Sequence, residues 1–201
     1  MKYTALTKEF YLNDTLPVAK ALLGKYLIRQ TESGRICAKI TEAEGYIGRI
    51  DKASHAYNYK KTERTKIMFE TGGIAYVYFI YGMYYCLNVV TEKEGEPCAV
   101  LIRGAEISEG LDIASQLRYG EAYENLTKAK IKNMSNGPGK LCKALNITKG
   151  QNSISLLEGE LIIAEKEGAS DTTGNITASK RIGIDYAEEA ADFLWRFELK
   201  E

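Results

Sequence analysis

Residues 74–90 read IAYVYFIYGMYYCLNVV, two runs of aromatic and β-branched residues on either side of Tyr81-Gly82-Met83. Residues of these types favour strands, and a short connection that contains glycine between two such runs is typical of a hairpin. We therefore predict antiparallel strands over 74–80 and 84–90. Alternation along the first strand places Tyr76 and Tyr78 on one face of it.

Outward from this hairpin, the chain predicts further strands and hairpins, with helices between them. We expect further strands at 25–30, 35–46 and 99–102 and a second hairpin that pairs 153–157 with 161–164. Residues 49–68 predict an irregular loop of functional length. Helices are expected from Leu16 to Gly24, at 106–118, at 121–132, from Lys140, and after Asp185 as an amphipathic helix carrying Phe193, Leu194 and Trp195. Strands do not alternate with helices, so the predicted fold is α+β, a single domain over residues 1–201 with a mainly antiparallel sheet flanked by helices.

Composition narrows the class of protein. Of the 201 residues, 45% are hydrophobic and 27% are charged, which are ordinary values for a globular chain. No run of 18 apolar residues predicts a membrane span, and the N-terminus lacks the apolar run of a secretory signal. The four cysteines are widely spaced and there is one histidine, which predicts buried thiols in a reducing cytoplasm. A disulfide scaffold, a zinc site and a cofactor are therefore not expected.

The charges are unevenly distributed, although the net charge is zero and the isoelectric point is near 6.6. Residues 128–149 carry six lysines and no acid, and residues 49–66 carry six cations and two acids. Between 92 and 124, eight acids stand against three cations. Such polarity is expected when one face of a protein meets a polyanion. Two solvated lysine-rich loops are the alternative.

Residues 41–46, TEAEGY, place carboxylates where a predicted interior strand reaches the polar loop. The two-residue period of a strand sets Glu42, Glu44 and Tyr46 on one face. A carboxylate in that position is suited to act as a general base for water. The alternative is an edge strand whose acids are solvated or paired with a neighbouring cation.

Other candidates surround this segment in the sequence. Tyr81 and Met83 at the hairpin tip suit a wedge inserted between stacked base pairs. Asn88 lies in an apolar run, where its amide requires a partner, either in the core or on an incoming base. His55, alone in the basic loop, is a candidate for lining a pocket or for a structural role. Arg103 follows a predicted strand, where it either orients Glu44 or neutralises Glu106.

The segment 135–141, SNGPGKL, lacks the frame of a nucleotide-binding loop. Its glycines and proline lead into a helix start among lysines. Backbone amides there, together with Lys140, are candidates for holding a phosphate, and plain helix capping is the alternative.

Taken together, these segments resemble the alkyladenine (3-methyladenine) DNA glycosylase family of the human and bacterial type. The resemblance covers roughly residues 10 to 197 and rests on six colinear segments, 41–48, 53–55, 76–88, 100–103, 136–142 and 181–183. Four positions depart from the family pattern as we know it. Ala43 and Gly45 replace Thr and Ala, and Glu63 and Ile107 replace prolines. The changes at Glu63 and Ile107 bear on local loop geometry and DNA affinity, not on the chemistry.

The resemblance implies a metal-free enzyme that removes alkylated or deaminated purines from DNA and leaves an abasic site. By position, Glu44 matches the family's water-activating glutamate and Arg103 the arginine beside it. The aromatic walls correspond to Tyr46, His55 and Tyr78, and the residue that screens the flipped base corresponds to Asn88. Tyr81 matches the intercalating residue. The candidate DNA contacts are Tyr81, Met83, Arg64, Lys140 and Arg181.

We accordingly expect a monofunctional glycosylase, since no lysine stands among the pocket candidates to act as an imine-forming nucleophile. The expected partner is damaged double-stranded DNA, and the protein is expected to be a monomer in a bacterial cytoplasm without membrane association. Two other functions remain open at this point. One is a nucleic-acid-binding module without catalysis, and the other is a hydrolase of free nucleosides.

Overall fold

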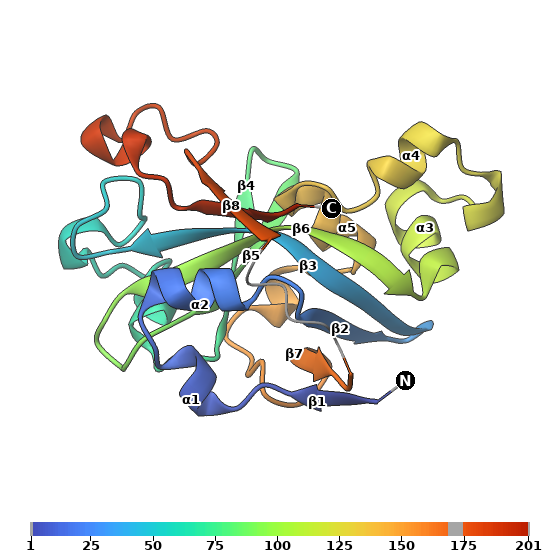
Figure 1. Cartoon of the computed structure of the whole chain (residues 1–201), viewed down its shortest axis with the longest axis horizontal. Coiled ribbons are helices and arrows are strands. Elements are labelled where there is room, and N and C mark those ends of the chain that lie inside the picture. Colours follow the sequence, from blue (N-terminus) through green and yellow to red (C-terminus); the bar gives the residue numbers. More distant parts are fainter. Residues whose placement is uncertain (1, 169–174, 201) are drawn as a thin grey trace.

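An antiparallel sheet runs through the centre of the molecule in the computed structural model, which describes residues 2–168 and 175–200 (Figure 1). The main path of the sheet has the order β1-β7-β2-β3-β6-β5-β4, and β9 pairs with both β3 and β8. All strand pairs are antiparallel within the described ranges. The strands are β1 (Tyr3–Ala5), β2 (Tyr26–Thr31), β3 (Gly34–Ile47), β4 (Ala75–Ile80), β5 (Tyr84–Val90), β6 (Cys98–Glu109), β7 (Leu161–Lys166), β8 (Ile176–Ser179) and β9 (Arg196–Leu199).

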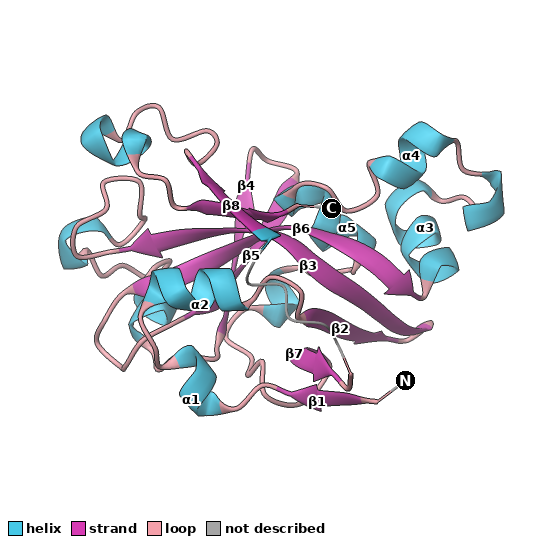
Figure 2. Ribbon diagram, in the orientation of Figure 1, coloured by secondary structure: helices cyan, strands magenta, loops and turns pink. Residues whose placement is uncertain are grey.

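Short helices surround the sheet (Figure 2), which confirms the predicted α+β class. The α-helices are α1 (Lys8–Tyr11), α2 (Thr15–Ala21), α3 (Leu111–Tyr119), α4 (Lys128–Lys132) and α5 (Pro138–Ala144). Short 3₁₀ helices are also present, at η1 (Tyr57–Tyr59), η2 (Lys66–Phe69), η3 (Tyr123–Asn125), η4 (Lys149–Gln151) and η6 (Glu188–Asp192). Among the described residues, no helix is long and apolar enough to cross a membrane.

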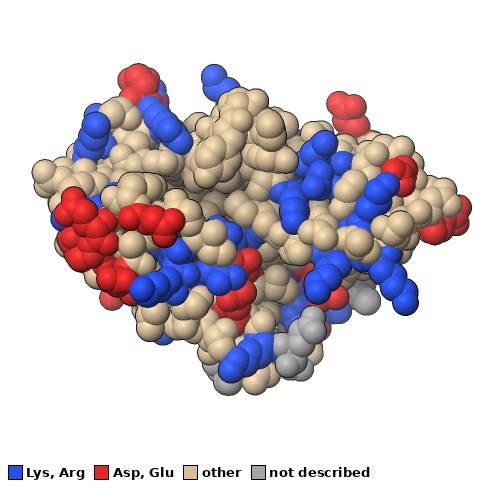
Figure 3. All heavy atoms as spheres, turned by 90° about the horizontal axis from the view of Figure 1, so that it is seen from above, with Lys and Arg blue, Asp and Glu red and all other residues tan. Residues whose placement is uncertain are grey.

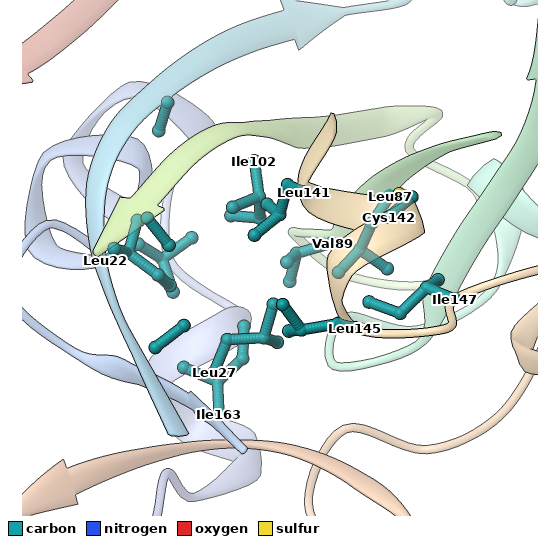
Figure 4. Close-up of a cluster of buried hydrophobic side chains, with 14 of the residues drawn as sticks. Leu22, Leu27, Leu87, Val89, Ile102, Leu141, Cys142, Leu145, Ile147 and Ile163 are labelled. Carbon is teal, nitrogen blue, oxygen red and sulfur yellow. The ribbon is translucent and has the colours of Figure 1, made fainter. Parts of the chain in front are cut away.

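The main core anchors α5 against the sheet (Figure 4). Leu141 of α5 and Leu145, the residue that follows its last turn, are fully buried in one cluster with Leu87 of β5 and Ile102 of β6. Burial of each such side chain stabilises the fold by about 1.5–3 kcal/mol. The start of α5 packs closely against β5. A Cβ atom at Gly139 would lie only 2.7 Å from Cγ of Tyr84, so this position has no room for a side chain.

The tyrosine-rich hairpin forms as predicted, with β4 and β5 paired from Ala75 opposite Val89 to Ile80 opposite Tyr84. At its tip, Tyr81 has φ 54° and Gly82 has φ 67°. Two successive residues in this region are characteristic of a type I′ turn, whose twist matches that of the flanking strands. The hairpin projects above the sheet in Figure 1.

The sheet is longer at β6 than the sequence predicted. The expected strand 99–102 extends from Cys98 to Glu109, and the helix expected at 106–118 begins only at Leu111. Pairing with the long β3 strand continues through Glu109 opposite Cys37, and this tertiary pairing overrides the helical propensity of the segment. The helix expected at 121–132 is reduced to η3 and the short α4.

The predicted C-terminal helix is wrong. Only Glu188–Asp192 is helical, as a 3₁₀ turn, and Arg196–Leu199 forms β9. Strand β9 pairs with Glu42–Glu44 of β3. Phe193, Leu194 and Trp195, which suggested a helix, lie in the extended segment that leads into this strand. The C-terminal part of the chain is thereby placed next to the carboxylates of β3.

The predicted hairpin between 153–157 and 161–164 is also wrong. Strand β7 pairs with β1 and β2, and Ser155 forms a single bridge to Ile74. Both segments have the alternation of strands, but that alternation does not specify which strand is the partner. The four cysteines, by contrast, are free and buried as predicted.

Candidate active site

A cavity of about 280 Å³ opens beneath the hairpin tip. This volume is close to the lower end of small-molecule pockets, roughly 300–1,000 Å³. Its walls come from β3, β4, β5, β6, the loop after β3, the start of α5 and the segment after β8. The polar and aromatic side chains among the lining residues are those of Tyr46, Ser54, His55, Tyr76, Tyr78, Tyr81, Tyr84, Asn88, Arg103 and Tyr186.

Glu44 lies on β3 just behind this lining, and 0% of its surface is exposed. Its Oε2 accepts a hydrogen bond from the Tyr46 hydroxyl at 2.8 Å, and its Oε1 accepts one from the backbone N–H of Ile182 at 3.0 Å. Nε of Arg103 lies 3.4 Å from Oε1. All three partners line the cavity, so the carboxylate lies at the cavity wall.

The environment of Glu44 acts on its acidity in two directions. Burial raises the pKa of the carboxyl above its ordinary value of 4.5, and this is the largest effect. The positive charge of Arg103 and the hydrogen bonds from Ile182 and Tyr46 act in the opposite direction and favour the ionised form. A buried carboxylate with a raised pKa is the arrangement that suits a general base.

Arg103 is held by a second carboxylate. Its Nε donates to Oε1 of Glu42 at 2.8 Å, and Nε of Arg196 on β9 donates to the same oxygen at 2.5 Å. Arg103 therefore contacts Glu42 and Glu44, not Glu106, and the predicted grouping of the β3 carboxylates is observed. Sequence reasoning missed Arg196 and the Ile182 amide, because only the pairing of β9 with β3 brings them here.

The predicted aromatic walls converge on the cavity. His55 and Tyr78 lie edge to face with their ring centroids 4.7 Å apart, and Nδ1 of His55 lies 3.0 Å from the Tyr76 hydroxyl. Burial, followed by the positive charge of Arg64, lowers the pKa of His55 to about 4. Tyr46 also lines the cavity, so the aromatic groups surround a space suited to a planar ligand.

Asn88 is buried on β5 and lines the same cavity. Its side-chain amide donates to the backbone carbonyl of Tyr76 at 3.1 Å across the hairpin. That bond satisfies the amide nitrogen within the protein, as predicted for a core asparagine. The same side chain also lines the cavity, so the two predicted alternatives, a core amide and a pocket residue, are compatible.

The hairpin tip carries large exposed side chains. Tyr81 is 79% exposed and Met83 is 65% exposed, whereas the tyrosines lower in the hairpin are largely buried. Tyr81 lines the mouth of the cavity together with Tyr186, which is 69% exposed and was not predicted. An exposed apolar cluster at a cavity mouth is typical of a binding surface.

The predicted cationic contacts occupy different environments. Arg64 is exposed, and its guanidinium lies 4.9 Å from the centre of the Tyr78 ring. Nζ of Lys140 donates to the side-chain oxygens of Asn133 at 2.7 Å and Asn136 at 3.1 Å. Figure 3 views the side from which the hairpin projects, and Lys and Arg side chains gather on either side of its largely uncharged centre.

The structure corrects the prediction for Arg181. Its side chain is 0% exposed and forms a two-point ion pair with Asp51, with N–O distances of 2.6 and 2.8 Å. Its guanidinium also lies over the rings of Tyr46 and Trp195. A buried guanidinium whose two terminal nitrogens are paired with Asp51 does not reach a DNA backbone, so Arg181 instead ties the segment after β8 to the loop after β3.

No group of three or more metal-ligating side chains occurs within residues 2–168 and 175–200. The chemical groups of the cavity are therefore a buried carboxylate, an arginine beside it, and aromatic walls. They can bind a planar, electron-poor group and promote attack by water next to it.

Comparison with known proteins agrees with this geometry. Residues 9–201 match the family described as Methylpurine-DNA glycosylase (MPG). A Clostridium perfringens (strain SM101) protein named "Putative 3-methyladenine DNA glycosylase" is 51% identical over 196 residues, which cover 98% of this chain and 96% of that protein. Proteins of the same name from Clostridium novyi (strain NT) and Alkaliphilus oremlandii (strain OhILAs) are 52% and 51% identical, over 98% of this chain and 95% and 96% of theirs.

Proposed function

The chain belongs to the methylpurine-DNA glycosylase family, and on that premise we propose that it hydrolyses the N-glycosidic bond of alkylated purines in DNA, with Glu44 as the base for water. The observation that carries the proposal is the buried Glu44 carboxylate behind a tyrosine-walled cavity. The product is an abasic site, and the enzyme acts in base excision repair.

Binding begins with extrusion of the damaged nucleotide from the duplex, which costs a few kcal/mol and less for a weakened pair. Tyr81, exposed at the hairpin tip, fills the vacated position in the stack. Exposed cations on this side of the molecule contact the phosphates (Figure 3). Arg64 and Lys140 are the cations that the sequence predicts for this role.

The walls favour damaged bases through charge. An N-alkylated purine is cationic, and an aromatic face attracts a cation by roughly 0.5–2 kcal/mol in addition to stacking of about 1–3 kcal/mol. Tyr46, His55 and Tyr78 supply such faces around the cavity. An undamaged purine gains the stacking alone, so it is bound less well without any reading of sequence.

The chemical step uses the good leaving group that a cationic purine already is. As the bond from the sugar C1′ to the purine nitrogen breaks, its electron pair goes to the purine and the sugar develops oxocarbenium character. The Glu44 carboxylate stabilises that charge and takes the proton of the water that attacks C1′, as the base of an inverting glycosidase does. The positive charge of Arg103 favours the ionised form of Glu44 against the effect of burial.

The reaction we propose ends at base release. Among the described residues, those that line the cavity include no lysine to form an imine with the sugar, so the enzyme is monofunctional. We further propose that the chain acts as a single domain and a monomer in the bacterial cytoplasm, on damaged double-stranded DNA.

The test uses duplexes that carry one 7-methylguanine, hypoxanthine or ethenoadenine, followed by alkaline cleavage of abasic sites. With protein in excess over DNA, release of 7-methylguanine is the expected result. No product from any of the three duplexes would exclude a glycosylase and favour a binding module. Release from free nucleosides at a similar rate, without steep salt dependence, would instead favour a nucleoside hydrolase.

A further inference from the structure

The wall of the cavity formed by His55 is backed by an exposed arginine. An Nη atom of Arg64 lies 3.3 Å from Nε2 of His55, while Nδ1 of the same ring lies 3.0 Å from the Tyr76 hydroxyl. Both ring nitrogens are therefore engaged. The ring edge faces Tyr78, whose face is in turn covered by the Arg64 guanidinium.

The chemistry of arginine assigns the protons in this chain of contacts. A guanidinium can donate a hydrogen bond and cannot accept one, so Nε2 of His55 must be the acceptor. The proton of the neutral ring is then on Nδ1, which donates to the Tyr76 oxygen. A doubly protonated ring would place an N–H opposite the N–H of Arg64, and the two charges would repel each other.

The groups that face His55 give no compensation for a positive ring. The one charged group among them is Arg64. The other groups are the phenols of Tyr76 and Tyr78 on β4, which stay neutral because burial raises their pKa values above the ordinary value of 10.0. In the described part of the chain, no carboxylate lies within salt-bridge distance of Arg64 or His55. The nearest acid in sequence, Glu63, pairs with Lys66 at 2.7 Å.

We propose that Arg64 is a positioning residue that fixes His55 as the neutral Nδ1–H tautomer and so keeps the cavity wall uncharged against a purine that is itself cationic. The benefit for a cationic purine rests on the function proposed above, whereas the tautomer and charge of His55 do not depend on it. Arg64 thus contributes to specificity from outside the cavity, whose lining does not include it within the described residues.

The protein suits a direct test, because His55 is its one histidine and gives a single set of imidazole signals in NMR spectra. In the wild type, we expect Nδ1–H in ¹H–¹⁵N spectra and a ring that stays neutral down to about pH 4. Arg64→Met removes both donor and charge, so the ring should titrate nearer its ordinary value of about 6.5. Arg64→Gln retains a donor without the charge and should restore the tautomer.

Lys61→Met is the matched control, since Lys61 is an exposed cation of the same loop whose Nζ lies 5.1 Å from the Phe69 ring centre. It removes the same charge from the loop without touching His55 and should leave the titration of His55 as in the wild type. An unchanged His55 titration and tautomer in Arg64→Met would overturn the proposal, whatever the activity of the protein.

A second experiment measures how the charge of His55 affects excision of the damaged base. With enzyme saturating, the rate of 7-methylguanine excision by Arg64→Met, relative to wild type, should fall between about pH 7.5 and about pH 5.5. The reason is that His55 becomes protonated at a higher pH in the variant than in the wild type. Adding His55→Gln should abolish this extra loss, because the titrating group is gone. A pH-independent ratio would contradict the role in specificity, and failure of wild-type excision would instead count against the proposed function.

Discussion

The hydroxyl of Tyr46 lies 2.8 Å from Oε2 of Glu44, two positions earlier on the same strand. One side chain therefore serves two surfaces, with its ring on the cavity and its hydroxyl on the buried carboxylate. Burial and the neighbouring charge of Glu44 raise the pKa of Tyr46 well above its ordinary value of 10.0, so the hydroxyl is the donor in this bond. Occupation of the cavity and the state of the carboxylate are thereby linked.

Glu44→Gln should abolish excision while leaving DNA binding intact. Loss of a general base lowers a rate by typically 10²–10⁴-fold. The measurement is single-turnover release of 7-methylguanine, together with the affinity for the same duplex. Glu106→Gln is the control, because Glu106 is an exposed carboxylate on the neighbouring strand β6. More than a tenth of the wild-type rate in Glu44→Gln would rule out Glu44 as the base.

The acid limb of the pH–rate profile should report Glu44. The base must be ionised, so the rate falls as the pH drops through its pKa, which burial raises above 4.5. Tyr46→Phe keeps the ring and removes a hydrogen bond that lowers this pKa. Its acid limb should therefore move to higher pH, with the plateau rate at high pH reduced by less than about tenfold. A shift to lower pH would contradict the arrangement.

Tyr81→Gly should separate base extrusion from stability. Loss of the stacking residue should slow excision from a paired duplex by about 1–3 kcal/mol, that is about 5- to 150-fold, and leave excision from a bulged or single-stranded lesion unchanged. The free energy of unfolding should stay within about 1 kcal/mol, because glycine adopts the left-handed φ of 54° without the cost that tyrosine has there. Equal slowing on both substrates would argue against a wedge.

Arg181→Met should destabilise the fold by about 3–5 kcal/mol, because it leaves the buried Asp51 carboxylate without its partner. Urea unfolding measures this, and the double variant Arg181→Met with Asp51→Asn should recover part of the loss. Where the double variant is folded, its affinity for undamaged DNA should equal that of the wild type. A steep loss of DNA affinity at full stability would restore the sequence-based role of Arg181.

The sequence predicted those parts of the fold that depend on residues close together in the chain. The hairpin of β4 and β5 follows from its residue types and its turn, and the position of Glu44 beside Tyr46 follows from the period of a strand. The placement of the aromatic and acidic residues around the cavity was accessible for the same reason, because most of them lie on β3, β4 and β5.

Contacts between residues that are distant in the sequence could not be predicted from it. The extension of β6 to Glu109 depends on the length of β3, and the strand character of Arg196–Leu199 depends on its pairing with Glu42–Glu44. The burial of Arg181 depends on Asp51, 130 positions away. The sequence around an arginine does not show whether its side chain faces solvent or an internal carboxylate. Only the fold distinguishes a DNA contact from an internal ion pair.

The pairing of β9 with β3 has a consequence for synthesis of the protein. During translation, the N-terminal parts of a chain emerge first. The strand that carries Glu44 is made early, but the Ile182 amide and Arg196 that complete its surroundings are made late. A ribosome-bound chain stalled before Ile182 therefore has a carboxylate without its full set of partners. The surroundings of Glu44 are therefore completed only once the chain has been made through β9.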